Sequence, residues 1–411
     1  MKFSRRTFLQ ASALGSAVAL APRLAFSASA TAPNDVLVVI FQRGAMDGLQ
    51  AIVPYGDADY YRLRPTIGIP ASGPGAVLPL DGLFGFNPAL APLLPLFQAG
   101  HLGVVHATGI KSGSRSHFQC QDTMERSYLG ASSSPSGWLN RHTSDVGPQG
   151  TFQAVGLASG LQVSLQGPAP TIGMQSISSF AVKSSSKRKT QIEDTLYQLY
   201  AANSKLGVSA RRALDATDFL ALANPSQFSA ANGALYPATT FGDQMLQVAQ
   251  LIKSGVGLQM ACVDIGGWDH HDDINTDLPP LLDELANTLL AFNTDLGTSM
   301  SGVTVITMTE FGRRAGENGS LGTDHGTGSA MLLMGGGVLG GVVYSNWPGL
   351  SAAKLYNGDL DATVDMRTVL SELLVKRARE PNLAAAFPGF SPGPYLGCFN
   401  ALSSTAYASA A

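Results

Sequence analysis

The chain has 411 residues and a formal net charge of −3 at pH 7, with 45% hydrophobic and 13% charged residues. This length is enough for one large domain or two ordinary ones, and the low net charge excludes a broad basic surface for nucleic acid. The three cysteines (Cys120, Cys262 and Cys398) are too few for a disulfide scaffold and lack metal-site spacing.

Residues 1–30 have the pattern of a secretory signal. A basic start leads into an apolar segment at residues 11–21, which is too short to cross a bilayer, and then into a small-residue cleavage site. The stretch SRRTFLQ, with Arg5 and Arg6, matches the twin-arginine (Tat) pattern; the alternative is a chance arginine pair in an ordinary signal. We therefore expect the Tat export machinery as a partner. The mature chain, residues 31–411, would be periplasmic or secreted and would have no transmembrane segment.

Five continuous apolar runs predict buried strands. Runs without polar alternation are typical of strands that are covered on both faces of a mostly parallel sheet. In chain order, these runs are residues 35–41, 102–109, 258–265, 303–313 and 330–341.

Helical apolar spacing separates these strands, which predicts an α/β fold with helices on both faces of the sheet. Residues 111–129 begin with a Gly/Ser turn and continue as a helix, and residues 279–297 predict a helix that starts at its two prolines. Further helices are predicted at residues 189–207, 209–223, 241–255 and 361–378. We expect a single domain over residues 31–411, in which the segment at about 131–235 elaborates the sheet.

Ionisable side chains gather where the predicted strands end. Open α/β sheets bind ligands just beyond the carboxyl ends of their strands. The side chains expected at that edge are Asp47 after the first strand; Ser114, Arg115, Ser116 and His117 after the second; Asp269, His270, His271, Asp272 and Asp273 after the third; and Glu310, Asp324 and His325 after the fourth.

Carboxylates and imidazoles are ligands for divalent cations such as Zn, Mn, Mg, Ca or Fe. The number of such groups exceeds one tetrahedral site, which favours a two-metal site able to stabilise both oxygens of a displacement at phosphorus or sulfur. Adjacent side chains on extended backbone point in opposite directions, so we expect at most one of His270 and His271 to be a ligand.

Other roles are common for some of these residues. An aspartate in a glycine turn, such as Asp47, is usually a turn residue. Serine before a helix, such as Ser116, is the commonest kind of N-cap. The histidines that lack clustered partners, for which we expect structural or surface roles, are His101, His106 and His142.

Four motifs resemble those of a known family. They are RGAMDGLQAIVPYGDADYYRLRP, SRSHFQCQDTMER, GGWDHHDDI and TEFGRRAGENGSLGTDHGTGSAMLLMGGGVLGG. They make nearly the whole mature chain similar to the Tat-exported bacterial proteins grouped as domain of unknown function 1501, a branch of the alkaline-phosphatase-like superfamily. The resemblance implies an alkaline-phosphatase/sulfatase-like fold. The turn GAMD departs slightly from the family, which has two glycines before the aspartate, but it retains Asp47.

The superfamily implies roles for these residues. Its hydrolases hold two metals with Asp and His at strand ends and place a Ser, Thr or modified Cys nucleophile at a helix start. Ser116 matches the nucleophile position, and Glu310-Phe311 stands where many relatives have an Asp-His pair, a departure that would remove a ligand. Together with Asp324 from the constellation above, the expected metal ligands are Asp47, Asp269, His271, Glu310, Asp324 and His325.

These observations predict an exported metal-dependent hydrolase of phosphate or sulfate esters. The expected catalytic residues are Ser116 as nucleophile, Arg115 as a partner of the anion's oxygens, and the adjacent His117. The expected cofactor is one or two divalent cations (Zn, Mn, Mg or Ca), and the substrate would be a small anionic ester. The alternative, which the departure at Glu310 favours, is a non-catalytic metal- or ligand-binding accessory protein of the same fold in the periplasm or at the surface.

Overall fold

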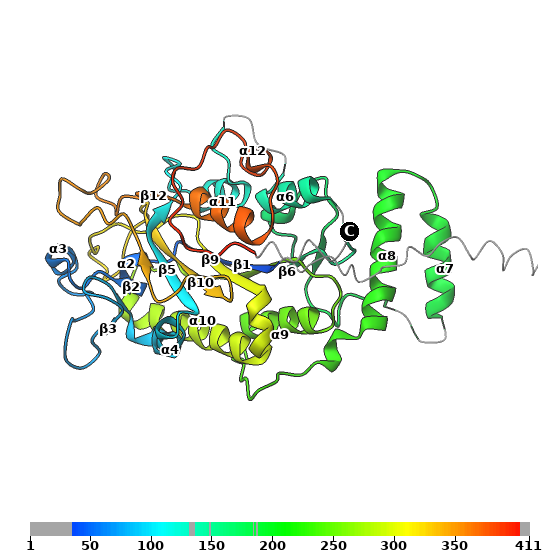
Figure 1. Cartoon of the computed structure of the whole chain (residues 1–411), viewed down its shortest axis with the longest axis horizontal. Coiled ribbons are helices and arrows are strands. Elements are labelled where there is room, and N and C mark those ends of the chain that lie inside the picture. The colour runs from blue at the N-terminus through cyan, green and yellow to red at the C-terminus, as the bar shows by residue number, and fades with distance from the viewer. Residues whose placement is uncertain (1–34, 131–135, 148, 184, 186–187, 403–411) are drawn as a thin grey trace, which may run out of the picture. The chain divides into compact units, whose positions relative to one another are not determined.

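The computed structural model describes residues 35–130, 136–147, 149–183, 185 and 188–402. The expected signal, residues 1–30, lies outside the described residues. A central sheet runs through the described part, and helices pack against both of its faces (Figure 1). The expectation of a mostly parallel α/β sheet with helices is therefore confirmed.

Nine strands of the described residues form the central sheet, in the order β11-β5-β10-β9-β1-β8-β6-β7, with β12 beside β5. Their bounds are β1 Val36–Gln42, β5 Leu102–Gly109, β6 Ala154–Leu157, β7 Ile172–Met174, β8 Met260–Ile265, β9 Val303–Met308, β10 Ser329–Gly335, β11 Val343–Tyr344 and β12 Val364–Asp365. A smaller sheet contains β2 Ile52–Val53, β3 Leu78–Pro79 and β4 Gly85–Phe86. The five expected strands correspond to β1, β5, β8, β9 and β10. The last two end earlier than expected, because a polar loop follows Met308 and a glycine turn follows Gly335.

The strand β10 runs antiparallel to both of its neighbours, β5 and β9. The other strand pairs of this sheet are parallel. Residues 309–328 connect β9 to β10 as a loop that contains no helix. A parallel return needs a long crossover connection, so a strand entered directly from this loop runs backwards. The loop therefore stays at the edge of the sheet where β9 ends.

Each predicted helix has a counterpart, but the helix predicted at residues 189–207 ends at Leu199 as α7, and α8 begins at Lys205 instead of residue 209. Their bounds are α2 Gly48–Ala51, α3 Ala58–Leu63, α4 Leu94–Gln98, α5 His117–Arg126, α6 Trp138–Val146, α7 Lys189–Leu199, α8 Lys205–Ala223, α9 Thr240–Lys253, α10 Ile274–Leu296, α11 Met366–Arg377 and α12 Leu383–Ala386. Short 3-10 helices are η1 Pro88–Leu93, η2 Val163–Leu165, η3 Pro225–Gln227 and η4 Gly297–Gly302. Among the described residues, none of the helices is both long and apolar enough to span a membrane.

The helix α10 does not start at its prolines as predicted. It begins at Ile274, and Pro279 and Pro280 lie inside it. Both Ile274 and Leu278 are completely buried, so the extra turn adds apolar burial that outweighs the backbone hydrogen bonds lost at the prolines.

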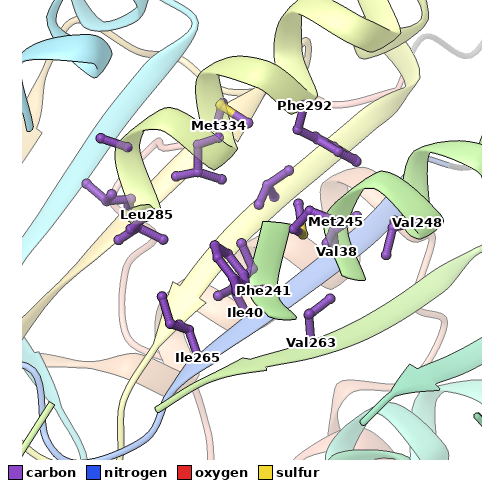
Figure 2. Packing of buried hydrophobic residues seen from close by; sticks show 14 of the residues in the cluster. Val38, Ile40, Phe241, Met245, Val248, Val263, Ile265, Leu285, Phe292 and Met334 are labelled. Atoms are coloured by element: carbon purple, nitrogen blue, oxygen red, sulfur yellow. The ribbon is translucent and has the colours of Figure 1, made fainter. Parts of the chain in front are cut away.

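Both faces of the strand β1 are covered by apolar side chains, which explains its continuous apolar sequence. Val38 and Ile40 belong to the core cluster that includes side chains of α9 and α10, as Figure 2 shows. Leu37, Val39 and Phe41 belong to a second cluster on the opposite face, with side chains of α6 and α11. Successive side chains of a strand point to opposite faces, so a sheet covered on both sides requires apolar residues at every position.

The segment expected as an elaboration, residues 131–235, contributes to the central sheet itself. Its strands β6 and β7 extend the sheet beyond β8, with β6 paired parallel to β8. The helices α7 and α8 follow, and α7 has no buried residue. The described residues between 35 and 402 belong to one compact unit.

The carboxyl ends of several strands lie at one edge of the sheet. The strands β8 and β9 each pair in parallel with β1, on its two sides. The strand β5 has the same direction as β9, because both pair antiparallel with β10 between them. The segments that meet at this edge are residues 43–47, 110–116, 266–273 and 309–328.

Candidate functional site

Three imidazoles and one carboxylate converge at this edge of the sheet. His117 is the first residue of α5, Asp269 and His271 follow β8, and His325 precedes β10. The Nε2 atom of His325 lies 3.0 Å from His117 Nε2 and 3.0 Å from His271 Nε2. The Asp269 Oδ1 atom lies 3.1 Å from His325 Nε2 and 3.0 Å from His271 Nε2, and Oδ2 lies 3.4 Å from His117 Nε2. We call these four residues the imidazole cluster.

The outer nitrogen of each imidazole faces an oxygen acceptor. His117 Nδ1 lies 2.8 Å from Glu310 Oε1, and His325 Nδ1 donates to the carbonyl oxygen of Arg115 at 2.8 Å. His271 Nδ1 lies 3.3 Å from Asp324 Oδ1. The pKa of both carboxyl groups is lowered because their hydrogen bonds outweigh burial, so each is ionised and accepts a hydrogen bond from Nδ1–H. This network assigns the Nδ1–H tautomer to all three rings, and their Nε2 lone pairs face one another.

Such an arrangement fits a cation. The ligand atoms of His117, Asp269 and His325 all lie within 4.8 Å of one another, and His271 adjoins this group. Tetrahedral Zn²⁺ with Zn–N bonds of 2.0–2.1 Å separates its ligand atoms by about 3.3 Å, which is close to the spacing found here. Imidazoles whose Nδ1–H groups are held by carboxylates or carbonyls are typical of metal-binding histidines. Among the described residues this is the one such group, and it would suit a single ion, the lower of the two numbers expected.

The surroundings of Asp269 keep its carboxyl group ionised. Burial raises its pKa, but the hydrogen bond and the charge of Arg313 outweigh burial, together with contributions from His325 and His117, and lower the pKa to about 2. The Arg313 Nη2 atom lies 2.6 Å from Asp269 Oδ1. Burial also lowers the pKa of His325, which favours the neutral imidazole that a metal requires.

Arg313 connects the loops that carry the cluster. The residue is 2% exposed, and its guanidinium donates to the carbonyl oxygens of Ala45, Thr323 and Trp268 at 2.7, 2.9 and 3.1 Å. Arg313 lies in the FGR stretch of the fourth family motif, and no role was predicted for it. A charged residue beside an apolar strand in a chain with few charges was the signal that could have identified it.

We expect Arg313→Met to destabilise the mature chain by about 3–5 kcal/mol, because it leaves buried carbonyl groups without donors and removes the partner of Asp269. The unfolding free energy should be measured in urea on metal-free protein, so that metal loss does not contribute. Arg212→Met, at an exposed position on α8, is the control and should change stability by less than about 0.5 kcal/mol. Equal stability of the two variants would contradict this role for Arg313.

Glu310 lies behind His117 rather than among the ligand atoms. Its side chain is completely buried, and Oε1 accepts hydrogen bonds from His117 Nδ1, Gly44 N and Gln121 Nε2 at 2.8, 2.9 and 2.9 Å. Burial raises its pKa, but the hydrogen bonds from Gln121 and His117 outweigh burial and lower it. Glu310, expected as a metal ligand, is therefore placed where it orients the imidazole of His117.

Glu310→Gln should lower metal affinity by about 10–100-fold, since the amide keeps the shape but loses the charge that holds the Nδ1 proton of His117. Titration of metal-free protein with Zn²⁺ in the presence of a competing chelator would measure this change. The buried pair of His142 and Glu380 is similar but lies outside the cluster, so Glu380→Gln is the matched control and should leave the affinity unchanged. Unchanged affinity in Glu310→Gln would contradict the orienting role.

Asp47 was expected as a ligand, but the structure commits both of its oxygens elsewhere. Oδ1 accepts from the backbone N–H of Gln50 at 3.0 Å as the N-cap of α2. Oδ2 accepts from Thr323 Oγ1 at 2.9 Å and lies 3.0 Å from Nη2 of the buried Arg64. Asp47 is itself 1% exposed. Its position matches the alternative of a turn and cap residue.

The other expected residues have different positions. Asp324 is exposed and holds His271 from outside, with Asn318 donating to the same oxygen at 3.2 Å. The Arg115 guanidinium faces Asp359, whose two oxygens lie 2.7 and 2.8 Å from Nη2, so it does not point into the cluster. Of the adjacent histidines, His270 is 6% exposed and only His271 joins the cluster.

Ser116 occupies the N-cap position of α5, but its side chain makes no capping hydrogen bond. The residue is exposed and directly precedes His117 of the cluster. The structure thus places the expected nucleophile beside the cluster at the N-terminus of α5.

Comparison with known proteins gives one family. A family model described as protein of unknown function (DUF1501) matches residues 104–375, a range that includes the whole imidazole cluster. No curated protein and no solved structure matches the chain.

Proposed function

The chain belongs to the DUF1501 family of proteins of unknown function, and we propose that it is an exported metal-dependent hydrolase of phosphate or sulfate esters. In this proposal, residues 1–30 direct export through the Tat machinery, and the mature chain acts in the periplasm or outside the cell. The sheet and its edge loops would be a variant of the alkaline-phosphatase-like fold that holds one divalent cation.

One observation carries the proposal. Three imidazoles have their Nδ1 atoms against oxygen acceptors and their Nε2 atoms together, beside a carboxylate whose pKa is lowered to about 2. Lone pairs and a negative charge repel one another at contacts of about 3 Å unless a cation lies among them. The residues that would hold it are His117, His271, His325 and Asp269.

The surroundings suit an anionic ester. A bound divalent cation would supply Lewis-acid chemistry, polarising an ester oxygen and lowering the pKa of a nucleophile. The α5 helix has ten residues, and its N-terminus directs backbone N–H groups and positive helix-dipole charge toward an anion beside Ser116. Arg313 keeps Asp269 ionised from the side away from the solvent.

The contacts of Arg115 and Glu310 favour a second candidate function. The guanidinium that was expected to bind the anion is paired with Asp359, and Glu310 is fully hydrogen-bonded behind His117. A site with these groups already occupied fits a metal- or ligand-binding accessory protein that performs no hydrolysis.

Metal analysis combined with an activity assay separates the two candidates. We expect about one Zn or Mn per mature chain and hydrolysis of aryl phosphates or sulfates. Chelator should abolish this hydrolysis, and added metal should restore it. Chelator should also lower the melting temperature, because a ligand at 100 times its Kd stabilises the folded state by about 2.7 kcal/mol. Bound metal without hydrolysis would favour the accessory protein, and a chain that binds no metal would contradict both candidates.

A further inference from the structure

A groove of about 370 Å³ begins at the first turn of α5, the helix whose first residue is His117 of the imidazole cluster. One wall is a stripe on α5, whose residues recur at spacings of three and four: Phe118, Gln121, Asp122 and Glu125. The same helix begins at His117 of the cluster. Gln121 donates a 2.9 Å hydrogen bond to Glu310, which in turn holds His117. The groove therefore runs along α5, away from the cluster and starting in the first turn of the helix.

The remaining walls come from the carboxyl ends of three parallel strands. Arg43 follows β1, Asp264 is near the end of β8, and residues 158–163 follow β6. Open α/β sheets bind ligands at such ends, and the volume is within the range of small-molecule sites. Gln162 lines the groove and is 5% exposed, and its Oε1 accepts no hydrogen bond from the described residues.

The charges of the groove compensate one another. Arg43 lies 3.1 Å from Glu125 and 2.9 Å from Asp264, and it is the cation among the described residues that line the groove. Asp122 pairs with Arg126 at 2.8 Å. A second anionic group would find no unpaired cation here, and a cationic group would find each carboxylate already paired. Hydroxyl groups fit this lining best, because carboxylate, amide and guanidinium groups offer both acceptors and donors.

An aromatic ring completes the lining. Phe118 is 87% exposed on the groove side of α5, although most Phe and Trp rings of the described residues are buried. The face of an aromatic ring carries partial negative charge and attracts the weakly positive C–H groups of a flat saturated ring. A sugar ring has such C–H faces and a rim of hydroxyl groups. Resting on the proposed hydrolase function, we propose that the groove binds the sugar part of a carbohydrate phosphate or sulfate ester, whose ester group faces the imidazole cluster.

Matched substrates test this proposal on the metal-loaded mature protein. The assay compares glucose 6-phosphate and glucose 6-sulfate with the cyclohexylmethyl and ethyl esters of the same acids. The first comparison removes the hydroxyl groups, and the second removes the ring. We expect kcat/KM for the glucose ester to exceed that for the cyclohexylmethyl ester by at least about tenfold.

Phe118→Ala should lower kcat/KM for the glucose ester by about tenfold and leave the ethyl ester unchanged, since the ethyl group is too short to cover the aromatic ring. Leu222→Ala, at a position on α8 that is 85% exposed, is the control and should change neither. Ethyl ester hydrolysis without a preference for glucose, or with a preference that Phe118→Ala does not reduce, would overturn the sugar groove and leave the hydrolase proposal standing.

If no ester is hydrolysed, equilibrium binding measurements test the groove instead. Calorimetric titration with glucose 6-phosphate and glucose 6-sulfate is then compared with inorganic phosphate and sulfate. A sugar-dependent gain in affinity of at least about tenfold that disappears in Phe118→Ala would support the groove while the hydrolase proposal fails. Equal affinity for the sugar ester and the inorganic anion would overturn the groove proposal as well.

Discussion

His325→Ala should remove the bound metal and lower ester hydrolysis by at least about 1000-fold. The Nε2 atom of His325 lies in the middle of the cluster, 3.0 Å from each of the other two imidazoles and 3.1 Å from Asp269. Removing it takes away the imidazole that adjoins the other three residues of the cluster. The substitution also frees the Arg115 carbonyl that precedes α5, so the approach to the helix N-terminus loses a hydrogen bond. Metal per chain is measured by elemental analysis, and turnover on the best aryl ester.

His101 offers a control from the same chain. It is exposed and lies in the loop before β5, at the amino end of that strand and away from the carboxyl edge. His101→Ala should keep full metal content, turnover and the loss of melting temperature with chelator. His325→Ala should show no response to chelator. Retention of stoichiometric metal in His325→Ala would mean that the cluster is not the metal site.

Ser116→Ala should reduce turnover by several orders of magnitude and leave the melting temperature nearly unchanged. An N-cap serine normally contributes about 1 kcal/mol through a hydrogen bond to the first turn of the helix. The Ser116 side chain makes no such bond in this structure, so the substitution should cost little stability. An exposed hydroxyl beside His117, at the N-terminus of α5, is in a position suited to a nucleophile. Ser116→Ala and the wild-type protein must be compared at the same metal occupancy.

A neighbouring serine makes the test specific. Ser114 donates from its hydroxyl to Gln119 at 2.6 Å and accepts from the backbone N–H of Ser116 at 3.2 Å, so it supports the turn. Ser114→Ala should lower the melting temperature more than Ser116→Ala and keep more of the activity. If Ser116→Ala hydrolyses esters at the wild-type rate, then Ser116 is not the nucleophile, and an activated water molecule becomes the candidate.

The sequence predicted the sheet well because the physical signal for it is local. Strands buried on both faces need apolar residues at every position, and β1, β5 and β8 are continuous apolar runs for this reason. Parallel strands then place their carboxyl ends together, which led to the correct expectation that Asp269, His271 and His325 lie at one edge of the sheet. The direction of β10 was not predicted, because it depends on the absence of a crossover helix in a loop with little periodicity.

The tertiary structure alone decided which atoms face one another at that edge. Asp47 and Glu310 carry the residue type of a metal ligand, but Arg64 and Thr323 hold the first, and Gly44, Gln121 and His117 hold the second. His117, expected among the catalytic residues, is placed among the converging Nε2 atoms of the imidazole cluster instead. These partners come from distant parts of the chain, and a side chain turns toward whichever partners pack beside it. Strand ends follow from local patterns, whereas the partners of each carboxylate and imidazole follow from contacts that no local pattern contains.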